Sequence, residues 1–414
     1  MAPTLACMEI QSSAPVSTRN HLRVLMLSDV YFPRVNGVST SIQTFRKCLV
    51  EAGHDVTLVA PVYGDELAEP NLVRIAARSV PRDPEDRMMQ WGSLMRRGSE
   101  LAAQGYDVVH VQTPFLAHYA GVKIARRYGL PIVESYHTFF EEYLYHYVPF
   151  VPATAMRFVA RRFSSSQCNA VDGLVVPSQA MLDVLRGYGV QAPATVIPTG
   201  IDLRQFSTGD GAHFRAAHGI ARDRPMMLYV GRVVFEKNIE FLLRMARAVV
   251  ATVPDAILVI AGEGPAVQPL RELAATLGLA NNTLFVGYLD RSGPLMDCYR
   301  AADAFVFASR TETQGLVLLE AMALGVPVVS TAIMGAKDIV GPGRGAIVAH
   351  EDVEDFSMKV VRVLTSPTLK KSLAADGREF ARRWAEDGFA ERLVEFYRNT
   401  IVAHQARPAT VAAV

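Results

Sequence analysis

The sequence predicts an α/β protein made of two doubly wound domains. Short apolar runs of strand type alternate with helical stretches, which is typical of parallel sheets covered by helices on both faces. The alternation is complete before about residue 197 and starts again at Pro225, so two sheets are expected rather than one large sheet. The 414 residues are enough to give each domain a hydrophobic core.

The first series of strands begins at residues 22–27, LRVLML. A polar loop follows, and then a helix over about 38–52 that ends at Gly53. Another helix is expected around 118–128. The remaining strands of this domain are expected at residues 55–60, 106–111, 130–134, 173–177 and 194–197.

Five further apolar runs make up the second series, with strands expected at 226–230, 256–260, 283–287, 303–308 and 326–330. From residue 371 the chain is again helical, to about residue 404. Pro, Gly and Asp interrupt the pattern at 198–206, where we expect the domain boundary. The predicted organisation is a disordered tail at 1–20, domains at 21–200 and 201–380, a C-terminal helix at 381–404 and a loose tail at 405–414.

Composition and charge argue against several classes of function. The net charge of +1 gives no reason to expect a nucleic acid partner. The four cysteines lie far apart with no paired spacing, which argues against zinc and against a disulfide framework and suits a reducing compartment. No apolar run is long enough to span a membrane, and the first twenty residues lack the pattern of a signal peptide. We therefore expect a cytoplasmic protein.

Ligand sites of parallel sheets lie at the carboxyl ends of the strands, so the loops there supply the candidate residues. Gly37 precedes a helix whose free N–H groups suit a phosphate, and a simple helix cap with a tight turn is the alternative. His137 is either a contact for a sugar hydroxyl or phosphate, or a structural histidine. Tyr136, Phe139 and Tyr143 belong to the same aromatic stretch, which could line an acceptor groove or pack a lid.

Two loops of the second domain have an unusual composition. Arg232 and Lys237 stand just before a helix, which suits a diphosphate, and surface ion pairs with neighbouring glutamates are the alternative. The turn Gly262-Glu263-Gly264 offers a surface against which a flat base could lie. The glycine pattern of nicotinamide enzymes is absent, as are a P-loop and a His-Glu-x-x-His metal site.

The stretch at 309–330, SRTETQGLVLLEAMALGVPVVS, predicts a loop, a buried helix and a buried strand in succession. Glu312 lies in the polar loop, and Gly315 opens a helix that ends at Gly325. Glu320 falls among apolar residues, where an ionised carboxylate is costly unless something binds it. An exposed glutamate on the polar face of the helix is the alternative.

Three arginines, Arg157, Arg161 and Arg162, alternate with apolar residues at helical spacing. This pattern predicts a short amphipathic helix with one cationic side. Such a helix either touches an anionic lipid surface or packs as an ordinary helix of the core.

Together, GRVVFEKN, AGEGP and the block at 312–330 closely resemble the retaining glycosyltransferases of family 4, which are of the GT-B type. The resemblance covers residues 22 to about 397. It implies two Rossmann-like domains that face each other across a cleft, with a nucleotide-sugar bound by the second domain. It also implies a final helix that crosses back to the first domain.

The resemblance further implies roles for the matching residues. Arg232 and Lys237 would hold the donor diphosphate, and Gly37 would let the first domain close onto it. Glu320 would accept hydrogen bonds from the ribose, and His137 would lie near the transferred sugar. The loop at that sugar comprises Glu312, Thr313, Gln314, Gly315 and Leu316, where the family often begins with Glu-Gly-Phe-Gly. The candidates for catalysis are His137, Arg232, Lys237 and Glu312, and the donor-binding set adds Gly262 and Glu263.

The first-domain signature, SDVYFPRVNGVSTSI with YHTFFEEYLYHYVP, resembles bacterial diacylglycerol glycosyltransferases and relatives that mannosylate glycolipids. It implies transfer of a hexose from a UDP- or GDP-sugar to a membrane lipid, at the inner face of the membrane. No metal or other cofactor is expected, because the cations can replace a metal and no Asp-x-Asp motif is present. A soluble acceptor, a nucleotide-sugar epimerase and a non-catalytic binding protein are the alternatives.

Overall fold

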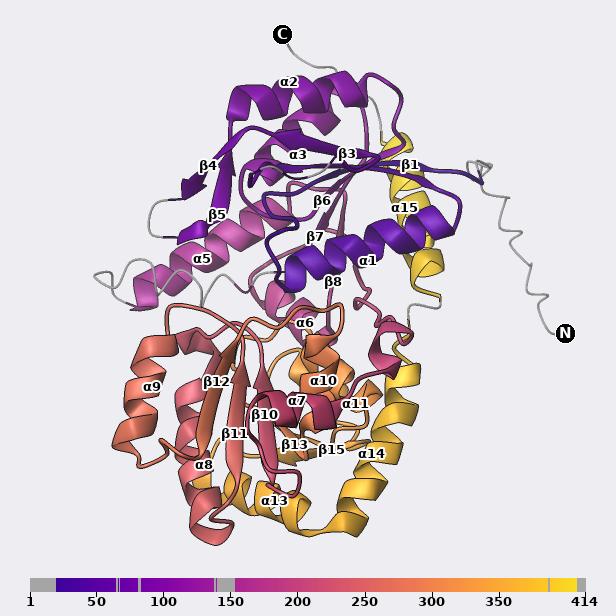
Figure 1. The fold of residues 1–414 in the computed structure, drawn as a ribbon. Coiled ribbons are helices and arrows are strands. Elements are labelled where there is room, and N and C mark those ends of the chain that lie inside the picture. Colours follow the sequence, from indigo (N-terminus) through magenta and orange to yellow (C-terminus); the bar gives the residue numbers. More distant parts are fainter. Residues whose placement is uncertain are drawn as a thin grey trace, which may run out of the picture.

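The computed structural model describes residues 20–64, 66, 68–80, 83–137, 139, 153–385 and 388–407. They form two α/β lobes, each built around a parallel sheet (Figure 1). Most of the predicted terminal tails, residues 1–19 and 408–414, lies outside the described part of the chain. None of the described helices combines the length and the apolar composition needed to cross a membrane.

Seven parallel strands form the sheet of the first lobe, in the order β3-β2-β1-β6-β7-β8-β9. The order runs outward in both directions from β1 and β6, which makes the sheet doubly wound. The strands are β1 Arg23–Leu27, β2 Asp55–Pro61, β3 Leu72–Ile75, β6 Val108–Val111, β7 Ile132–Ser135, β8 Gly173–Val176 and β9 Ala194–Val196. The helices are α1 Gly37–Glu51, α2 Trp91–Ala102, α3 Leu116–Tyr128, α5 Ala153–Cys168 and α6 Gln179–Gly187.

Six parallel strands repeat this arrangement in the second lobe, in the order β12-β11-β10-β13-β14-β15. They are β10 Met226–Val230, β11 Ile257–Ala261, β12 Thr283–Gly287, β13 Ala304–Phe307, β14 Val328–Thr331 and β15 Ala346–Ala349. The helices are α7 Gly211–Ala217, α8 Ile239–Thr252, α9 Val267–Thr276, α10 Pro294–Ala301, α11 Leu316–Ala323, α12 Ala336–Val340, α13 Val353–Thr365 and α14 Pro367–Arg382. Two short 3₁₀ turns, Gln205–Ser207 and Phe235–Lys237, complete the lobe. The two predicted doubly wound domains are confirmed, and each predicted strand has a counterpart at nearly the same place.

The last helix, α15 Phe389–Gln405, returns to the first lobe (Figure 1). Phe389, Leu393 and Tyr397 recur every four residues, so they share one face of the helix, and all three are buried in the first-lobe core with α1 and β1. The sequence suggested one helical stretch from 371 to 404. The structure has two helices instead, and Gly388 adopts a left-handed φ of 75° between them, directly before α15.

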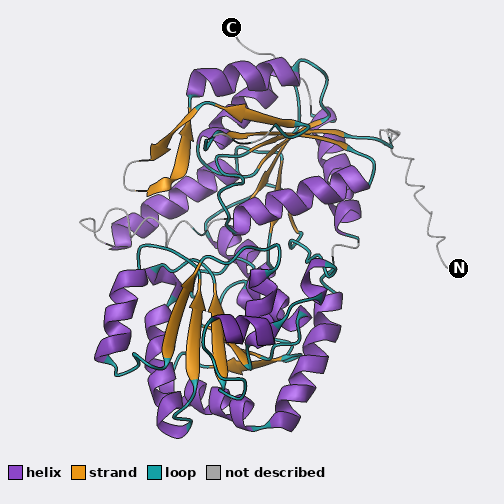
Figure 2. Ribbon diagram, viewed as in Figure 1, coloured by secondary structure: helices purple, strands orange, loops and turns teal. Residues whose placement is uncertain are grey.

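Three parts of the fold have no clear signal in the sequence. They are β3 with the hairpin β4–β5, the helix α2, and β15. The hairpin, Ala77–Val80 and Asp83–Met89, forms a separate antiparallel pair beside the main sheet (Figure 2). Its strands are rich in charged residues, which hides the alternation expected of a half-buried strand. β15 has only four residues and follows a Gly-Pro-Gly-Arg-Gly run that looks like loop alone.

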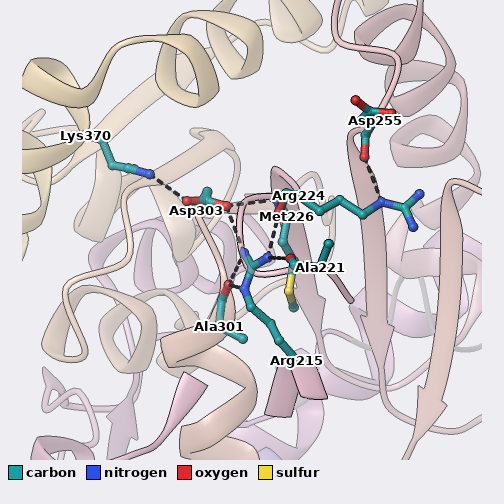
Figure 3. Close-up of polar contacts among 8 residues, drawn as sticks. All are labelled: Arg215, Ala221, Arg224, Met226, Asp255, Ala301, Asp303 and Lys370. Carbon is teal, nitrogen blue, oxygen red and sulfur yellow. Dashed lines mark hydrogen bonds and ion pairs between the residues drawn. The ribbon is translucent and has the colours of Figure 1, made fainter. Parts of the chain in front are cut away.

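A buried arginine, Arg215, joins several elements of the second lobe (Figure 3). The Arg215 guanidinium donates to the carbonyl oxygens of Ala301, Ala221 and Arg224 at 2.7–3.0 Å and lies 3.1 Å from Asp303 Oδ2. Asp303 also receives the Lys370 ammonium at 2.6 Å, so the network joins α7, α10, α14 and the start of β13.

Replacing Arg215 with methionine is expected to destabilise the protein by about 3 kcal/mol, because the three carbonyl groups lose their charged donor and Asp303 keeps only Lys370 of its two charged partners. Chemical denaturation of the variant would measure the loss. Arg244→Met is the matched control, since Arg244 is half exposed and pairs with Glu240 one helical turn away. It should cost about 0.5 kcal/mol or less, and equal effects of the two substitutions would contradict the assignment.

Candidate active site

A cleft of about 860 Å³, here called the central compartment, lies between the lobes at the carboxyl ends of both sheets. A side compartment of about 1230 Å³ adjoins it, because Arg34, Arg87 and Leu316 line both. The central compartment is lined by the predicted donor residues Gly37, Arg232, Lys237, Glu312, Thr313, Gln314, Gly315 and Leu316, and by His137. Glu263 and Glu320 line the side compartment.

Lys237 and Glu312 form an ion pair across the loops that follow β10 and β13. The Lys237 Nζ lies 2.9 Å from Glu312 Oε2, and the other Glu312 oxygen accepts a hydrogen bond from the Gly315 N–H at the start of α11. The alternative surface pair between Lys237 and Glu240 is not formed, since Glu240 pairs with Arg244. The predicted cation is therefore held in the cleft beside the predicted sugar-binding carboxylate.

Arg232 follows β10 and lines the same compartment. Within the described residues its guanidinium has no ion-pair partner, whereas its backbone carbonyl accepts a hydrogen bond from the Tyr229 hydroxyl at 3.0 Å. Glu236 of the same loop also lines the compartment, so the charges of this wall nearly balance. The guanidinium of Arg232 is the group here that suits a diphosphate.

The turn at Gly262 and Gly264 has a structural explanation that the sequence did not supply. Both residues have a φ above 140°, and a Cβ at either one would clash with the main chain of the loop after β10. The Val233 N–H donates to the Glu263 carbonyl at 2.8 Å, so the two loops are joined. Gly262 thus positions Arg232 by close loop packing, and a base lying against it remains a prediction.

Glu320 is buried, as predicted for a carboxylate with a bound partner, and the alternative of an exposed polar face is wrong. Its partners are Arg291, 2.5 Å from Oε1, and the Tyr299 hydroxyl, which donates to Oε2 at 2.9 Å. Burial, reinforced by the Glu320 charge, raises the pKa of Tyr299 well above its usual range, so this hydroxyl stays a donor. Arg291 was not foreseen, because it lies in a polar loop with no motif around it.

The loop between Glu312 and Gly315 joins the two lobes. The side-chain amide of Gln314 accepts from the Thr199 N–H at 2.9 Å and donates to the Thr199 carbonyl at 2.7 Å. The Ser178 hydroxyl donates to the Thr313 carbonyl, and the Thr313 hydroxyl donates to the His137 carbonyl. Where the family often has Gly-Phe, this chain thus has two residues that hold the lobes together, and their contacts with a donor sugar stay predictions.

Gly37 begins α1, and Asn36 caps the helix by accepting from the Ser39 N–H at 2.8 Å, which confirms the cap. A phosphate at Gly37 stays a prediction. Asp29 is a cleft residue that the sequence reasoning missed. It follows β1 and accepts hydrogen bonds from Thr113 and from the Ala117 N–H near the start of α3.

His137 lies at the cleft, with its Nε2 3.2 Å from Gln112 Oε1. Burial lowers its pKa to about 4, so the ring is neutral at pH 7. It is partly buried and lines the cleft, and a contact with a sugar hydroxyl stays a prediction.

The predicted acceptor residues have different surroundings. Tyr136 is buried in the first-lobe core and shares a hydrogen bond of 2.9 Å with Ser164, so the prediction that it contacts an acceptor is wrong. Tyr136 is held there because its backbone N–H, one residue past the end of β7, still donates to the Val175 carbonyl of β8. Phe139 does line the central compartment, and Tyr143 lies outside the described residues. Other apolar residues of that wall are Val80, Met88, Phe115, Tyr119 and Phe163.

Helix α5 is amphipathic, as predicted. Met156 and Ala160 are buried, while Arg157, Arg161 and Arg162 are exposed. Two large apolar residues, Phe158 at 69% and Val159 at 55% exposure, lie among the arginines. The helix thus packs on the core with one side and presents a mixed cationic and apolar face with the other.

Three cysteines of the described chain, Cys48, Cys168 and Cys298, are buried and free, and Cys7 lies outside it. The described residues also contain no group of three or more His, Cys, Asp and Glu side chains that could hold a metal ion. A metal-independent reaction stays a prediction.

The folded protein is expected to lose about 2 to 3 kcal/mol of stability between pH 7 and pH 5. Burial lowers the pKa of His110 to about 3 and that of His137 to about 4, so below about pH 6.5 the unfolded chain binds protons that the folded chain does not. Asp29 offsets part of this, because burial raises its pKa to about 6 and the folded state takes up its proton first.

Urea denaturation at pH 7, 6 and 5 would measure this loss. In His110→Asn the same pH change should cost about 2 kcal/mol less, because one of the two depressed histidines is gone. An unchanged pH dependence in that variant would contradict the assignment.

Comparison with known proteins gives the family. Residues 35–205 match the family described as Glycosyltransferase Family 4, and residues 211–380 match Glycosyl transferases group 1. An alpha-monoglucosyldiacylglycerol synthase of Streptococcus pneumoniae is 28% identical over 92% of this chain and 87% of its own length. A D-inositol 3-phosphate glycosyltransferase of Actinosynnema mirum is 31% identical over 70% of this chain and 72% of its own length.

The solved structures give the fold. The Anabaena protein HepE in complex with UDP-glucose superimposes with a TM-score of 0.73 at 16% identity, over 92% of this chain and 100% of that chain. The likeness extends over both lobes of this chain. The chain therefore has the GT-B fold and belongs to glycosyltransferase family 4.

Proposed function

We propose that this glycosyltransferase moves a hexose from a UDP- or GDP-sugar to the hydroxyl of a membrane lipid, such as diacylglycerol or a glycolipid, with retention at the anomeric carbon. The observation that carries the proposal is the adjoining pair of compartments. One holds Arg232, Lys237 and Glu312, and the other holds the buried carboxylate of Glu320. This arrangement suits a nucleoside on one side and a diphosphate-linked sugar on the other.

The donor is bound through its charges and hydroxyl groups. Arg232 and Lys237 face the diphosphate, and Glu320 accepts hydrogen bonds from the ribose beside Arg291. Glu312 accepts from the hydroxyls of the hexose. The UDP-glucose held by the structural neighbour HepE supports a uridine donor.

The chemistry follows from the leaving group. The bond between the anomeric carbon and the phosphate oxygen breaks, and negative charge grows on the diphosphate, where the two cations and the helix start at Gly37 stabilise it. The acceptor hydroxyl attacks the same face of the anomeric carbon, and its proton passes to the departing phosphate oxygen. His137 orients a hydroxyl of the donor sugar and stays neutral throughout.

A lipid acceptor is supported by the apolar wall of the central compartment and by the outer face of α5. Phe115 and Tyr119 at that wall are nearly half exposed, and large exposed apolar groups often mark a binding surface. The arginines of α5 suit anionic lipid headgroups, which would place the enzyme on the inner face of the cell membrane. A soluble acceptor is the second candidate, because one relative is named for D-inositol 3-phosphate.

The test is a screen of UDP- and GDP-hexoses against vesicles that contain diacylglycerol and against soluble sugars including inositol phosphate. Mass spectrometry would identify the product, and NMR would give its anomeric configuration. A glycosylated lipid supports the proposal. A product formed only from soluble sugars supports the second candidate, a transferase with a soluble acceptor. Nucleotide release without any acceptor product would contradict the transferase mechanism.

A further inference from the structure

We infer that Tyr397 and His110 are positioning residues that set, through Gln112, which ring nitrogen of His137 carries the proton. This inference rests on the proposed contact between His137 and the donor sugar. It gives the crossing helix α15 a role in the site beyond packing. We call the hydrogen-bonded residues Tyr397, His110, Gln112 and His137 the relay. Of these four, only His137 lines the cleft.

Three hydrogen bonds connect the crossing helix to the cleft, and a fourth holds His110 in place. The Tyr397 hydroxyl lies 2.6 Å from His110 Nδ1, and His110 Nε2 lies 2.9 Å from the Ser135 hydroxyl. Gln112 Nε2 lies 3.1 Å from the same His110 Nδ1. Gln112 Oε1 in turn lies 3.2 Å from His137 Nε2.

The surroundings hold these groups in place. Tyr397, His110 and Gln112 are fully buried, so no solvent competes for their hydrogen bonds. The Phe45 ring of α1 stacks on His110 with centroids 6.0 Å apart and lies 6.1 Å from the ring of His137. The relay is therefore a fixed part of the first-lobe core.

The Tyr397 phenol determines which groups of the relay donate a hydrogen bond and which accept one. Burial raises the pKa of Tyr397 well above its usual range, so the phenol keeps its proton. Within the described residues its hydroxyl has no other hydrogen-bond partner than His110 Nδ1, so it must donate to that nitrogen. His110 is neutral, because burial lowers its pKa to about 3, and its single N–H is then on Nε2 and donates to Ser135.

The orientation of the Gln112 side-chain amide then determines the tautomer of His137. Because His110 Nδ1 is an acceptor, the NH₂ end of the Gln112 amide faces His110 and the oxygen faces His137. His137 Nε2 must therefore carry the proton, and Nδ1 of the neutral ring keeps its lone pair. This assigns His137 as an acceptor of a hydrogen bond from a donor-sugar hydroxyl, rather than a donor to a sugar oxygen.

NMR with selectively ¹⁵N-labelled histidine measures the tautomers directly. In the full-length protein at pH 7, His137 should show a protonated Nε2 and an unprotonated Nδ1. In Tyr397→Phe the amide of Gln112 is free to turn over, so His137 should show a mixture of tautomers. The inference is wrong if His137 carries its proton on Nδ1, or if Tyr397→Phe leaves the tautomer unchanged.

Kinetics of the variants separate this relay from simple loss of packing. Tyr397→Phe should lower kcat about tenfold, the effect of one misplaced hydrogen bond, with little change in the KM for the donor. Tyr106→Phe is the matched control, because Tyr106 donates one hydrogen bond to Thr57 in the same lobe and should leave kcat within about twofold.

A double-mutant cycle completes the test. In a Gln112→Met background, which cuts the relay, Tyr397→Phe should cause no further loss of kcat. If the fold-loss of kcat in the double variant equals the product of the two single losses, Tyr397 acts by packing alone and the inference is overturned. A wild-type protein without transferase activity would defeat the proposed function instead, and the tautomer measurement would still decide on the relay.

Discussion

Replacing Lys237 with alanine is expected to lower kcat by about a hundredfold or more. A charge-assisted hydrogen bond contributes about 1.5 to 3 kcal/mol, which corresponds to roughly ten- to a hundredfold in rate when it is made in the transition state. The variant also leaves the Glu312 carboxylate, now 2.9 Å from the Lys237 ammonium, without its counter-charge. Because that carboxylate would then repel the departing diphosphate, the effect should reach the upper end of the range.

Steady-state kinetics with the donor identified in the acceptor screen would measure this effect, together with thermal unfolding to establish that the variant is folded. Lys237→Arg keeps the charge and should recover part of the rate. Lys359→Ala is the matched control, since Lys359 forms an ion pair of 2.7 Å with Asp355 on α13, away from both compartments. Turnover of Lys237→Ala within twofold of the wild type would remove the cation from the mechanism.

The parts of the site that could be predicted are those encoded by local pattern. Burial with a bound partner was one of two interpretations of Glu320, because this residue stands among apolar residues of a helix, and the structure confirms the burial. Gly315 was expected to open that helix, and it does so with a left-handed φ of 95°. Strand periodicity and helix-terminal glycines depend on a few neighbouring residues, so a short stretch of sequence is enough to recognise them.

The parts that could not be predicted depend on contacts between distant segments. Arg291 meets Glu320 across 29 positions, and Tyr397 meets His110 across 287. No spacing rule relates such residues before the sheet order is known. Tyr136 was assigned to an acceptor groove because an aromatic run has no periodicity that separates a buried ring from a cleft ring. Its burial depends on where β7 ends, which sequence patterns place only within a few residues.

Replacing Glu320 with alanine is expected to lower both stability and activity. The carboxylate is 2% exposed and is the counter-charge of Arg291, so its loss leaves a partly buried guanidinium unpaired and the Tyr299 hydroxyl without a good acceptor. Breaking a buried pair in this way costs about 3 to 5 kcal/mol. The lower end applies here, because Arg291 is about a quarter exposed and can turn into the side compartment. The kcat/KM for the donor should fall about a hundredfold at the same time, since the ribose loses a charged acceptor.

Glu320→Gln separates the two roles of this side chain. The amide keeps the size of the side chain and an oxygen that accepts from Tyr299, so the loss of stability should be about half of that in Glu320→Ala. It removes the negative charge that the ribose hydroxyls would use, so the donor KM should still rise about tenfold. Urea denaturation of the two variants gives the loss of stability. Donor titration, with nucleotide release as the readout, gives the donor KM. If donor binding in Glu320→Gln equals that of the wild type while stability falls, Glu320 serves only to anchor Arg291, and the nucleoside must bind elsewhere in the cleft.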